Sequence, residues 1–284
     1  MKLTVFTTAA DFLDRVGVAL FAGEAENSLA LGVALQVRNG YQYGPDAPFF
    51  ACVEDGERIA LIALCTPPYN LLLCAEKADP EAIAQVAHRL AEQGVTLPGA
   101  HGRIDVVDAF VRAWKAETGV LSSVAMEQRL YKLTEVTRPT SVAGQARWAV
   151  ADDAAFLTPW AQAFVDEAMP DGPHSDLPTM IGRAIADRRL LVWEYGDVVS
   201  MCAQTRPTPH GASVGLVYTP PDLRGRGFAT ACVAELSQRV LDSGKSFCTL
   251  FTNLANPTSN AIYQRIGYQP LGDFREVRFS RVVA

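Results

Sequence analysis

The sequence predicts an α/β fold with a mixed sheet, present as two similar halves. Runs with the periodicity of amphipathic helices alternate with short apolar runs that have the length of buried strands. The order of these runs in residues 1–138 repeats in residues 146–284, which indicates an internal duplication. Residues 137–144, near the middle of the chain, are small or polar and include a proline, as expected of a linker.

The second half has the clearer pattern. Two helices precede a pair of strands joined by a Gly-Asp turn signal. A third strand leads into a helix in which Phe228, Cys232 and Leu236 recur every four residues, and Gly244 is the expected C-cap. The expected elements are helices over residues 153–168 and 177–187, strands over 190–195, 198–205 and from 214, a helix from 228, a strand over 246–252, a short helix, and a last strand through 276–279.

The first half repeats this order. Its expected elements are helices over residues 10–22 and 25–38, strands over 49–53, 59–65 and 69–74, helices over 80–92 and 106–117, and a last strand over 126–133. The alternative is a separate α/β domain whose similar order of elements is coincidental.

The most informative stretch is residues 214–229, an apolar strand followed by a proline turn and a glycine-rich helix start. Gly225 and Gly227 let the backbone approach an anion, and the first N–H groups of the helix are unpaired. Such a helix start binds anions, although the glycines could serve only the tight turn. A nucleotide P-loop is excluded because Phe228 and Ala229 stand where it requires Lys and then Ser or Thr. The spacing of the dinucleotide fingerprint is also missing.

Two linked motifs resemble the GNAT acetyltransferase superfamily. Arg224, Gly227 and Ala229 fit its acyl-CoA signature, which is Arg or Gln, two residues, Gly, one residue, then Gly or Ala. Residues 256–268 are similar to its last segment, with a loop asparagine, a tyrosine on a short helix, and a glycine followed by an aromatic residue. The resemblance covers the chain from about residue 146 to its end and implies a GNAT-like fold.

The whole chain resembles tandem members of this superfamily that have one degenerate half. The corresponding loop of the first half, residues 74–80, has no glycine and contains Glu76 and Asp79, which would repel a phosphate. We therefore expect a degenerate GNAT-like domain over residues 1–138 that lacks the CoA loop, and a catalytic domain over residues 146–284.

The resemblance implies acetyl-CoA as the acyl-donor cosubstrate. Amides from Arg224 to Thr230 would hold its pyrophosphate, with the arginine side chains flanking it, and the backbone of Val217 and Thr219 would pair with the pantetheine arm. The loop asparagines would lie near that arm, although Asn-Pro is also an ordinary helix start. The expected cofactor-binding residues are Val217, Tyr218, Thr219, Arg224, Gly225, Arg226, Gly227, Phe228, Ala229, Thr230, Asn256 and Asn260.

The reaction that the resemblance implies is direct attack of a neutral primary amine on the thioester. Tyr263 would protonate the departing thiolate, and Glu194 is a candidate base, acting directly or through water. Tyr263 could instead only pack, and a strand glutamate commonly faces solvent. No Cys or Ser stands in the setting of a nucleophile, so no covalent enzyme intermediate is expected.

The acceptor is expected to contact two variable loops, residues 169–176 and 206–211. Asp171 and Asp176 could attract a cationic small amine or amino-terminal group, although surface acids are usually only solvated. Two alternatives stay open, a CoA-binding sensor without turnover and transfer of a longer acyl group. A homodimer is compatible with the sequence.

Composition narrows the remaining classes of function. The chain has 284 residues, 49% of them apolar, and a net charge of −6 with no Lys/Arg run, so we expect no nucleic-acid partner. It has neither an 18-residue apolar run nor the apolar core of a signal peptide, which predicts no membrane partner and a cytoplasmic protein. Its six cysteines and four histidines show no metal-ligand spacing, so no metal is expected.

Overall fold

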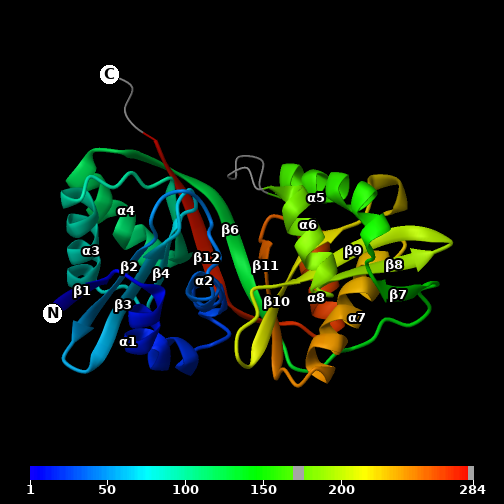
Figure 1. Ribbon diagram of the computed structural model, residues 1–284. Coiled ribbons are helices and arrows are strands. Elements are labelled where there is room, and N and C mark those ends of the chain that lie inside the picture. The colour runs from blue at the N-terminus through cyan, green and yellow to red at the C-terminus, as the bar shows by residue number, and fades with distance from the viewer. Residues whose placement is uncertain (169–175, 281–284) are drawn as a thin grey trace. The chain divides into compact units, whose positions relative to one another are not determined.

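The computed structural model describes residues 1–168 and 176–280, which form two compact units (Figure 1). The first unit contains Met1–Leu130, Thr252–Ala255 and the chain from Leu271 onward, and the second contains Tyr131–Phe251 and Asn256–Pro270. The units therefore do not follow the halves of the sequence in full, because the last strand of each half contributes residues to the other unit.

The sheet of the first unit has the strand order β1-β2-β3-β4-β5-β12-β6, in which β4 and β5 are parallel. Alternate residues of a strand point to opposite faces, so Leu61 and Ala63 belong to the core with α3 and α4, whereas Ile62 and Leu64 belong to the core with α1 and α2. The elements are β1 (Lys2–Phe6), α1 (Ala9–Ala22), α2 (Ser28–Arg38), β2 (Phe49–Asp55), β3 (Arg58–Cys65), β4 (Leu71–Cys74), α3 (Pro80–Glu92), β5 (Gly99–Arg103), α4 (Ile104–Thr118), β6 (Leu121–Leu133) and β12 (Gln269–Ser280).

The second unit is built in the same way, with the strand order β6-β11-β10-β9-β8-β7. Leu191 and Cys202 belong to the core with α7 and α8, whereas Val192 and Met201 belong to the core with α5 and α6. The elements are β7 (Gln145–Trp148), η1 (Ala151–Asp153), α5 (Ala154–Ala168), α6 (Leu177–Ala186), β8 (Leu190–Tyr195), β9 (Asp197–Thr205), β10 (Gly211–Tyr218), η2 (Pro221–Leu223), α7 (Phe228–Asp242), β11 (Phe247–Asn253) and α8 (Pro257–Ile266).

Several helices begin where the sequence supplies a capping side chain. Thr8, Asp79, Asp176 and Asn256 each accept a hydrogen bond from the backbone N–H three residues later. The last three are each followed by a proline within the first two helical positions, where its missing N–H has no helical partner to lose.

The structure confirms the predicted mixed α/β fold, and the two halves contain the same order of helices and strands apart from the short turns η1 and η2. Three strands were not predicted: β1, β5 and β7. Strand β5 gives no apolar signal because Gly99 and Gly102 occupy positions that have no room for a side chain. A Cβ at Gly99 would lie 2.0 Å from the Val277 oxygen, and one at Gly102 would lie 2.6 Å from the Leu73 oxygen. Strand β6 also begins five residues before the expected 126–133, whereas β12 agrees with the expected last strand, which opens after Gly267 and ends in 276–279.

Among the described helices, none is long and apolar enough to cross a membrane.

Candidate active site

Strands β10 and β11 separate in the middle of the second unit. Their parallel pairing runs from Gly211 and Phe247 to Ser213 and Thr249 and stops there. At the last paired position, the buried hydroxyls of Ser213 and Thr249 lie 3.1 Å apart. Beyond this point β10 still pairs with β9 but not with β11, so one backbone edge of β10 is open to an extended ligand.

A β-bulge follows directly in β10. The register with β9 shifts between Gly215 and Tyr218, and Leu216 has a φ of 51°, in the left-handed region that a leucine rarely adopts. Bulges of this kind change the direction of a strand and of its backbone groups, and they occur often beside active sites. The predicted contact Val217 lies inside the bulge, and Tyr218 and Thr219 follow it.

The glycine-rich turn forms the expected helix start. Gly225 and Gly227 have φ values of 78° and 84°, and Gly227 is the N-cap of α7. Ala231 N–H bonds to the Gly227 oxygen, as in a regular helix. The six N–H groups before it, from Gly225 to Thr230, have no partner among residues 1–168 and 176–280. A row of unpaired amides at the positive end of a 15-residue helix is suited to bind an anion such as a pyrophosphate.

The two arginines of this turn have different surroundings. Arg224 donates from Nε to the Thr219 oxygen at 2.8 Å and from Nη2 to both carboxylate oxygens of Glu167 at 2.8 and 2.9 Å. Arg226 stacks on the Phe228 ring at 5.7 Å. Arg224 therefore connects the end of β10 to α5 and holds the shape of the turn. The Thr219 oxygen keeps one lone pair for the predicted pantetheine contact.

Tyr263 is buried on α8, the helix after β11. Its ring packs between the rings of Tyr131 and Tyr268, with centroids 6.5 and 6.0 Å away. No residue in the described part of the chain forms a hydrogen bond with its hydroxyl. Burial raises the pKa of the Tyr263 phenol above its usual value near 10, and the nearby Cys202 adds to the increase. The phenol is therefore protonated at neutral pH and has a proton to donate.

The two asparagines of the last motif bind within the protein. Asn256 is the N-cap of α8, and its Oδ1 accepts a bond of 3.0 Å from the Ser259 N–H. Asn260 accepts from the Tyr131 hydroxyl at 2.9 Å and donates to the Asn256 oxygen at 2.7 Å. Both side chains stabilise the helix that carries Tyr263, and a contact with the CoA arm stays a prediction.

Glu194 lies at the end of β8 in an ion pair. Its Oε1 accepts from Arg147 Nε at 2.6 Å, and Arg147 also binds Asp153 through bonds of 2.5 and 2.9 Å. The hydrogen bonds from Arg147 hold the pKa of Asp153 below its usual value. This network gives Glu194 a structural role that joins β7, η1 and β8, and its role as a base stays a prediction.

The expected acceptor loops are described only in part. Asp171, with the rest of residues 169–175, lies outside the described residues. Asp176 caps α6 by accepting from the Thr179 N–H at 3.1 Å. The 206–211 loop is held by Lys245, whose ammonium donates to the oxygens of Thr208 and Pro209 at 2.7 and 3.0 Å.

The corresponding helix start of the first unit already has anionic partners. Asp79 caps α3 and lies 3.4 Å from Arg58, and the Ala78 N–H donates to the Asp105 carboxylate at 2.9 Å. Two carboxylates thus occupy the place where the second unit has unpaired amides. This arrangement agrees with the absence of a glycine from residues 74–80.

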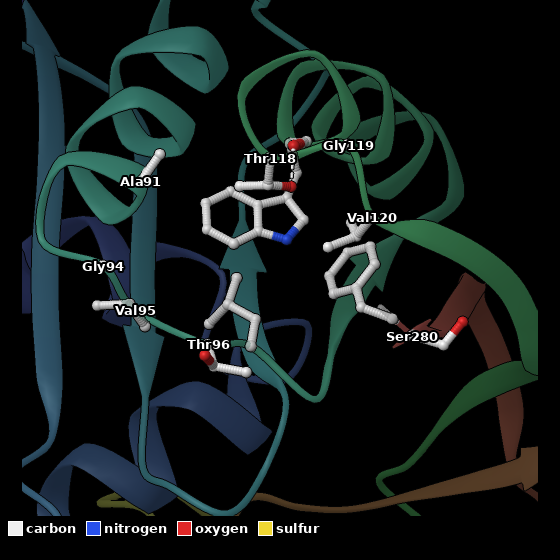
Figure 2. A pocket seen from close by; sticks show the side chains of 11 residues that line it. Ala91, Gly94, Val95, Thr96, Thr118, Gly119, Val120 and Ser280 are labelled. Atoms are coloured by element: carbon white, nitrogen blue, oxygen red, sulfur yellow. Dashed lines mark hydrogen bonds between the residues drawn. The ribbon is translucent and has the colours of Figure 1, made fainter. Parts of the chain in front are cut away.

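A hollow of about 460 Å³ lies elsewhere in the first unit, and no predicted site residue lines it (Figure 2). It lies between the end of α3, represented by Ala91, the end of α4 at Thr118 and Gly119, and the end of β12 at Ser280. Trp114 also lines it and has a buried indole N–H without a partner in the described structure. We assign this hollow no role in the site.

Possible metal ligands are scattered. In the described ranges, no group of three or more His, Cys, Asp or Glu side chains is placed to hold a metal ion. The six cysteines are all free, and Cys202 and Cys232 have their sulfurs 3.3 Å apart in the core. Burial raises the pKa of the Cys202 thiol, which keeps it protonated.

Sequence reasoning missed several residues that shape the site. Glu167 and Tyr131 contact it from 57 and 129 residues away in the sequence, a separation that leaves no local pattern. Leu216 gave no signal because a leucine does not indicate a positive φ. Ser200 bonds to the Tyr218 oxygen and the Thr219 hydroxyl at 3.1 and 2.9 Å, and it reads as an ordinary strand residue.

The chain is similar to several known proteins in sequence and in fold. Residues 193–278 match the family of FR47-like proteins. A GCN5-related N-acetyltransferase from Sphaerobacter thermophilus is 16% identical with a TM-score of 0.63, over 99% of this chain and 96% of that one. A Drosophila protein is 13% identical with a TM-score of 0.66, over 98% of each chain. A tandem GNAT protein from the clavulanic acid biosynthesis pathway is 13% identical with a TM-score of 0.53, also over 98% of each chain.

The comparison with curated proteins finds no match. At these identities the solved structures establish the fold, and they cover both halves of the chain. The chain therefore has the fold of these tandem GNAT structures, and its residues 193–278 are similar to FR47-like proteins.

Proposed function

We propose that the protein is an acetyl-CoA-dependent N-acetyltransferase that acts on a primary amine through its second unit. The observation that carries this proposal is the row of unpaired amides from Gly225 to Thr230, which follows directly after a strand with an open backbone edge. An acyl-CoA needs both features, because its pyrophosphate is an anion and its pantetheine arm has amide groups that can pair with a strand.

In this proposal the donor lies along β10. The amides at the start of α7 bind the pyrophosphate, and the backbone around Val217 and Thr219 pairs with the pantetheine arm. Ser200 supports this segment from the β9 side by bonding to the Tyr218 oxygen. The thioester then lies where β10 and β11 separate.

The amine nitrogen attacks the thioester carbonyl, a C–N bond forms, and the C–S bond breaks. The Tyr263 phenol gives its proton to the departing sulfur and is reprotonated from solvent, while the amine loses one proton to a base or to water. The products are the N-acetylated amine and free CoA thiol. Glu194, whose Oε1 is bonded to Arg147, is the candidate for this base, acting directly or through water.

The acceptor we propose is a small amine or an amino-terminal group. This choice, like the cytoplasmic location and the absence of nucleic-acid and membrane partners, rests on the sequence. A homodimer is compatible with the proposal and is not required by it.

The test is calorimetric titration with acetyl-CoA of the intact protein and two variants, Gly225→Asp and Gly244→Asp. Both glycines have positive φ, at 78° and 92°, and no atom lies within 4 Å of a Cβ built on either one. Gly225 lies just before α7 and Gly244 just after it, so only Gly225→Asp places a carboxylate against the pyrophosphate. We expect saturable binding, weakened more than about tenfold by Gly225→Asp and less than about twofold by Gly244→Asp.

Release of CoA thiol is then measured with a panel of primary amines. No acetyl-CoA binding by the intact protein, or equal weakening in both variants, would contradict the proposed donor site. Binding without thiol release under any amine would favour a sensor, and release only from longer acyl-CoA donors would change the group transferred.

A further inference from the structure

Tyr131 contacts α8 from another part of the sequence. It is among the last residues of β6, it is fully buried, and it belongs to the second unit. Its hydroxyl donates to Asn260 Oδ1 at 2.9 Å and accepts from Gln264 Nε2 at 3.2 Å. Residues 260 and 264 are one helical turn apart, so this one hydroxyl binds two successive positions on the same face of α8.

Tyr263 lies on the helix between these two positions, and its side chain is not held by a comparable hydrogen bond among the described residues. Its two ring neighbours are fixed by their hydroxyls: Tyr131 by the bonds to α8, and Tyr268 by a bond of 2.9 Å to Ser237 on α7. The Tyr263 hydroxyl has no partner in the described structure. Its place is therefore set by the position of α8 and by ring packing, which leaves the hydroxyl available for a ligand.

We propose that Tyr131 is a positioning residue, which sets the place of α8 so that the Tyr263 hydroxyl meets the departing sulfur. This inference rests on the proposed acetyl transfer. It also assigns a use to β6: the last strand of the half without a CoA loop supplies a fixed point for the acid of the other half. A displacement of about 1 Å at a reacting group can lower a rate by orders of magnitude, so a hydroxyl remote from the thioester can control the rate.

The test compares Tyr131→Phe with Tyr268→Phe. Each variant keeps its ring against Tyr263 and loses one buried tyrosine hydroxyl, but only Tyr131→Phe releases α8. We expect hydrogen exchange of the α8 amides to accelerate about tenfold in Tyr131→Phe and to change less than about twofold in Tyr268→Phe. Unchanged exchange of α8 in Tyr131→Phe would overturn the proposal, whether or not an acceptor is found.

Kinetics with an amine acceptor from the panel test the link to the acid. We expect Tyr131→Phe to lower kcat about tenfold, with the KM for acetyl-CoA within about twofold of the unmodified protein. In the background of Tyr263→Phe the same change should lower kcat no further, because the group that it positions is already gone. An equal tenfold loss in both backgrounds would show that Tyr131 acts independently of Tyr263 and would refute the inference. Faster α8 exchange in a protein that shows no thiol release would instead contradict only the proposed function.

Discussion

Replacing Arg224 by methionine separates two roles for the arginine of the glycine-rich turn. As a phosphate ligand it would contribute to acetyl-CoA affinity, whereas as a brace it contributes to the stability of the second unit. The structure favours the brace, because Nε and Nη2 are already bonded to Thr219 and Glu167. Arg226→Met is the matched control, since it removes the same charge from the same turn.

The magnitude follows from the exposure of the partners. The side chains of Arg224 and Glu167 are 45% and 51% exposed, so their ion pair contributes at most about 1 kcal/mol. The bond to the carbonyl of Thr219, which is 8% exposed, contributes about 1.5–3 kcal/mol because the donor is charged. We therefore expect Arg224→Met to lower the free energy of unfolding by about 2–3 kcal/mol. Arg226→Met, which loses only a stacking contact, should lower it by less than about 1 kcal/mol.

Urea unfolding followed by tryptophan fluorescence measures the difference, since Trp148, Trp160 and Trp193 report on the second unit. Calorimetry on the same variants should give acetyl-CoA affinities within about fivefold of each other, because both lose one charge near the phosphates. The reasoning would be refuted if Arg224→Met were no less stable than Arg226→Met, or if it bound acetyl-CoA more than about tenfold more weakly than the control.

Three further changes test other parts of the structure. Asp153→Asn should lower the free energy of unfolding by about 2–3 kcal/mol at pH 7. Because the pKa of the folded Asp153 is depressed, this contribution is present above about pH 4 and disappears as the pH falls through the folded pKa, so the unfolding curves of the two proteins should converge in acid and not in base. Tyr263→Phe should lower kcat about 10- to 100-fold and leave the acetyl-CoA affinity within about twofold of that of the unmodified protein. Because burial raises the pKa of this phenol, kcat of the unmodified protein should not fall through loss of its proton below about pH 10. An unchanged kcat in Tyr263→Phe would exclude the role of Tyr263 as the acid. Gly102→Ala should destabilise the first unit by more than about 2 kcal/mol, because its Cβ would lie 2.6 Å from the Leu73 oxygen. Its control is Gly182→Ala in helix α6, where no atom lies within 4 Å of the added Cβ, and this change should stabilise the protein slightly. Equal effects of the two changes would contradict the strand contact.

The elements that could be predicted from the sequence are those with a local cause. Helix α7 has a regular apolar face and glycines at both ends, so it was located to within a residue or two, and the Asn-Pro start of α8 indicated a short helix in residues 256–268. Strand β5 was missed because the close approach of β12 and β4 requires glycines, which are the residues that normally argue against a strand. The glycine-rich turn before α7 could be predicted for the same reason, because its glycines and the start of the helix are local features of the sequence.

The surroundings of the site could not be read in this way. The bulge at Leu216 depends on how β10 meets β9, and the bond from Arg224 to Glu167 depends on where α5 ends. The contacts of Tyr131 join residues 129 and 133 positions apart. Each of these is a consequence of the assembled fold, so no spacing in the sequence encodes it.

Because β6 and β12 each contribute residues to both units, the linker is not a suitable place to divide this protein into two fragments. A cut within residues 137–144 would look natural, yet the fragment that starts at residue 146 would lack Tyr131 and the end of β6. The fragment that ends at residue 138 would lack β12, whose residues pair with β5 from Phe274 to Arg278. Neither fragment carries all the chain that its own core needs. The shortest piece that we expect to fold therefore contains both halves.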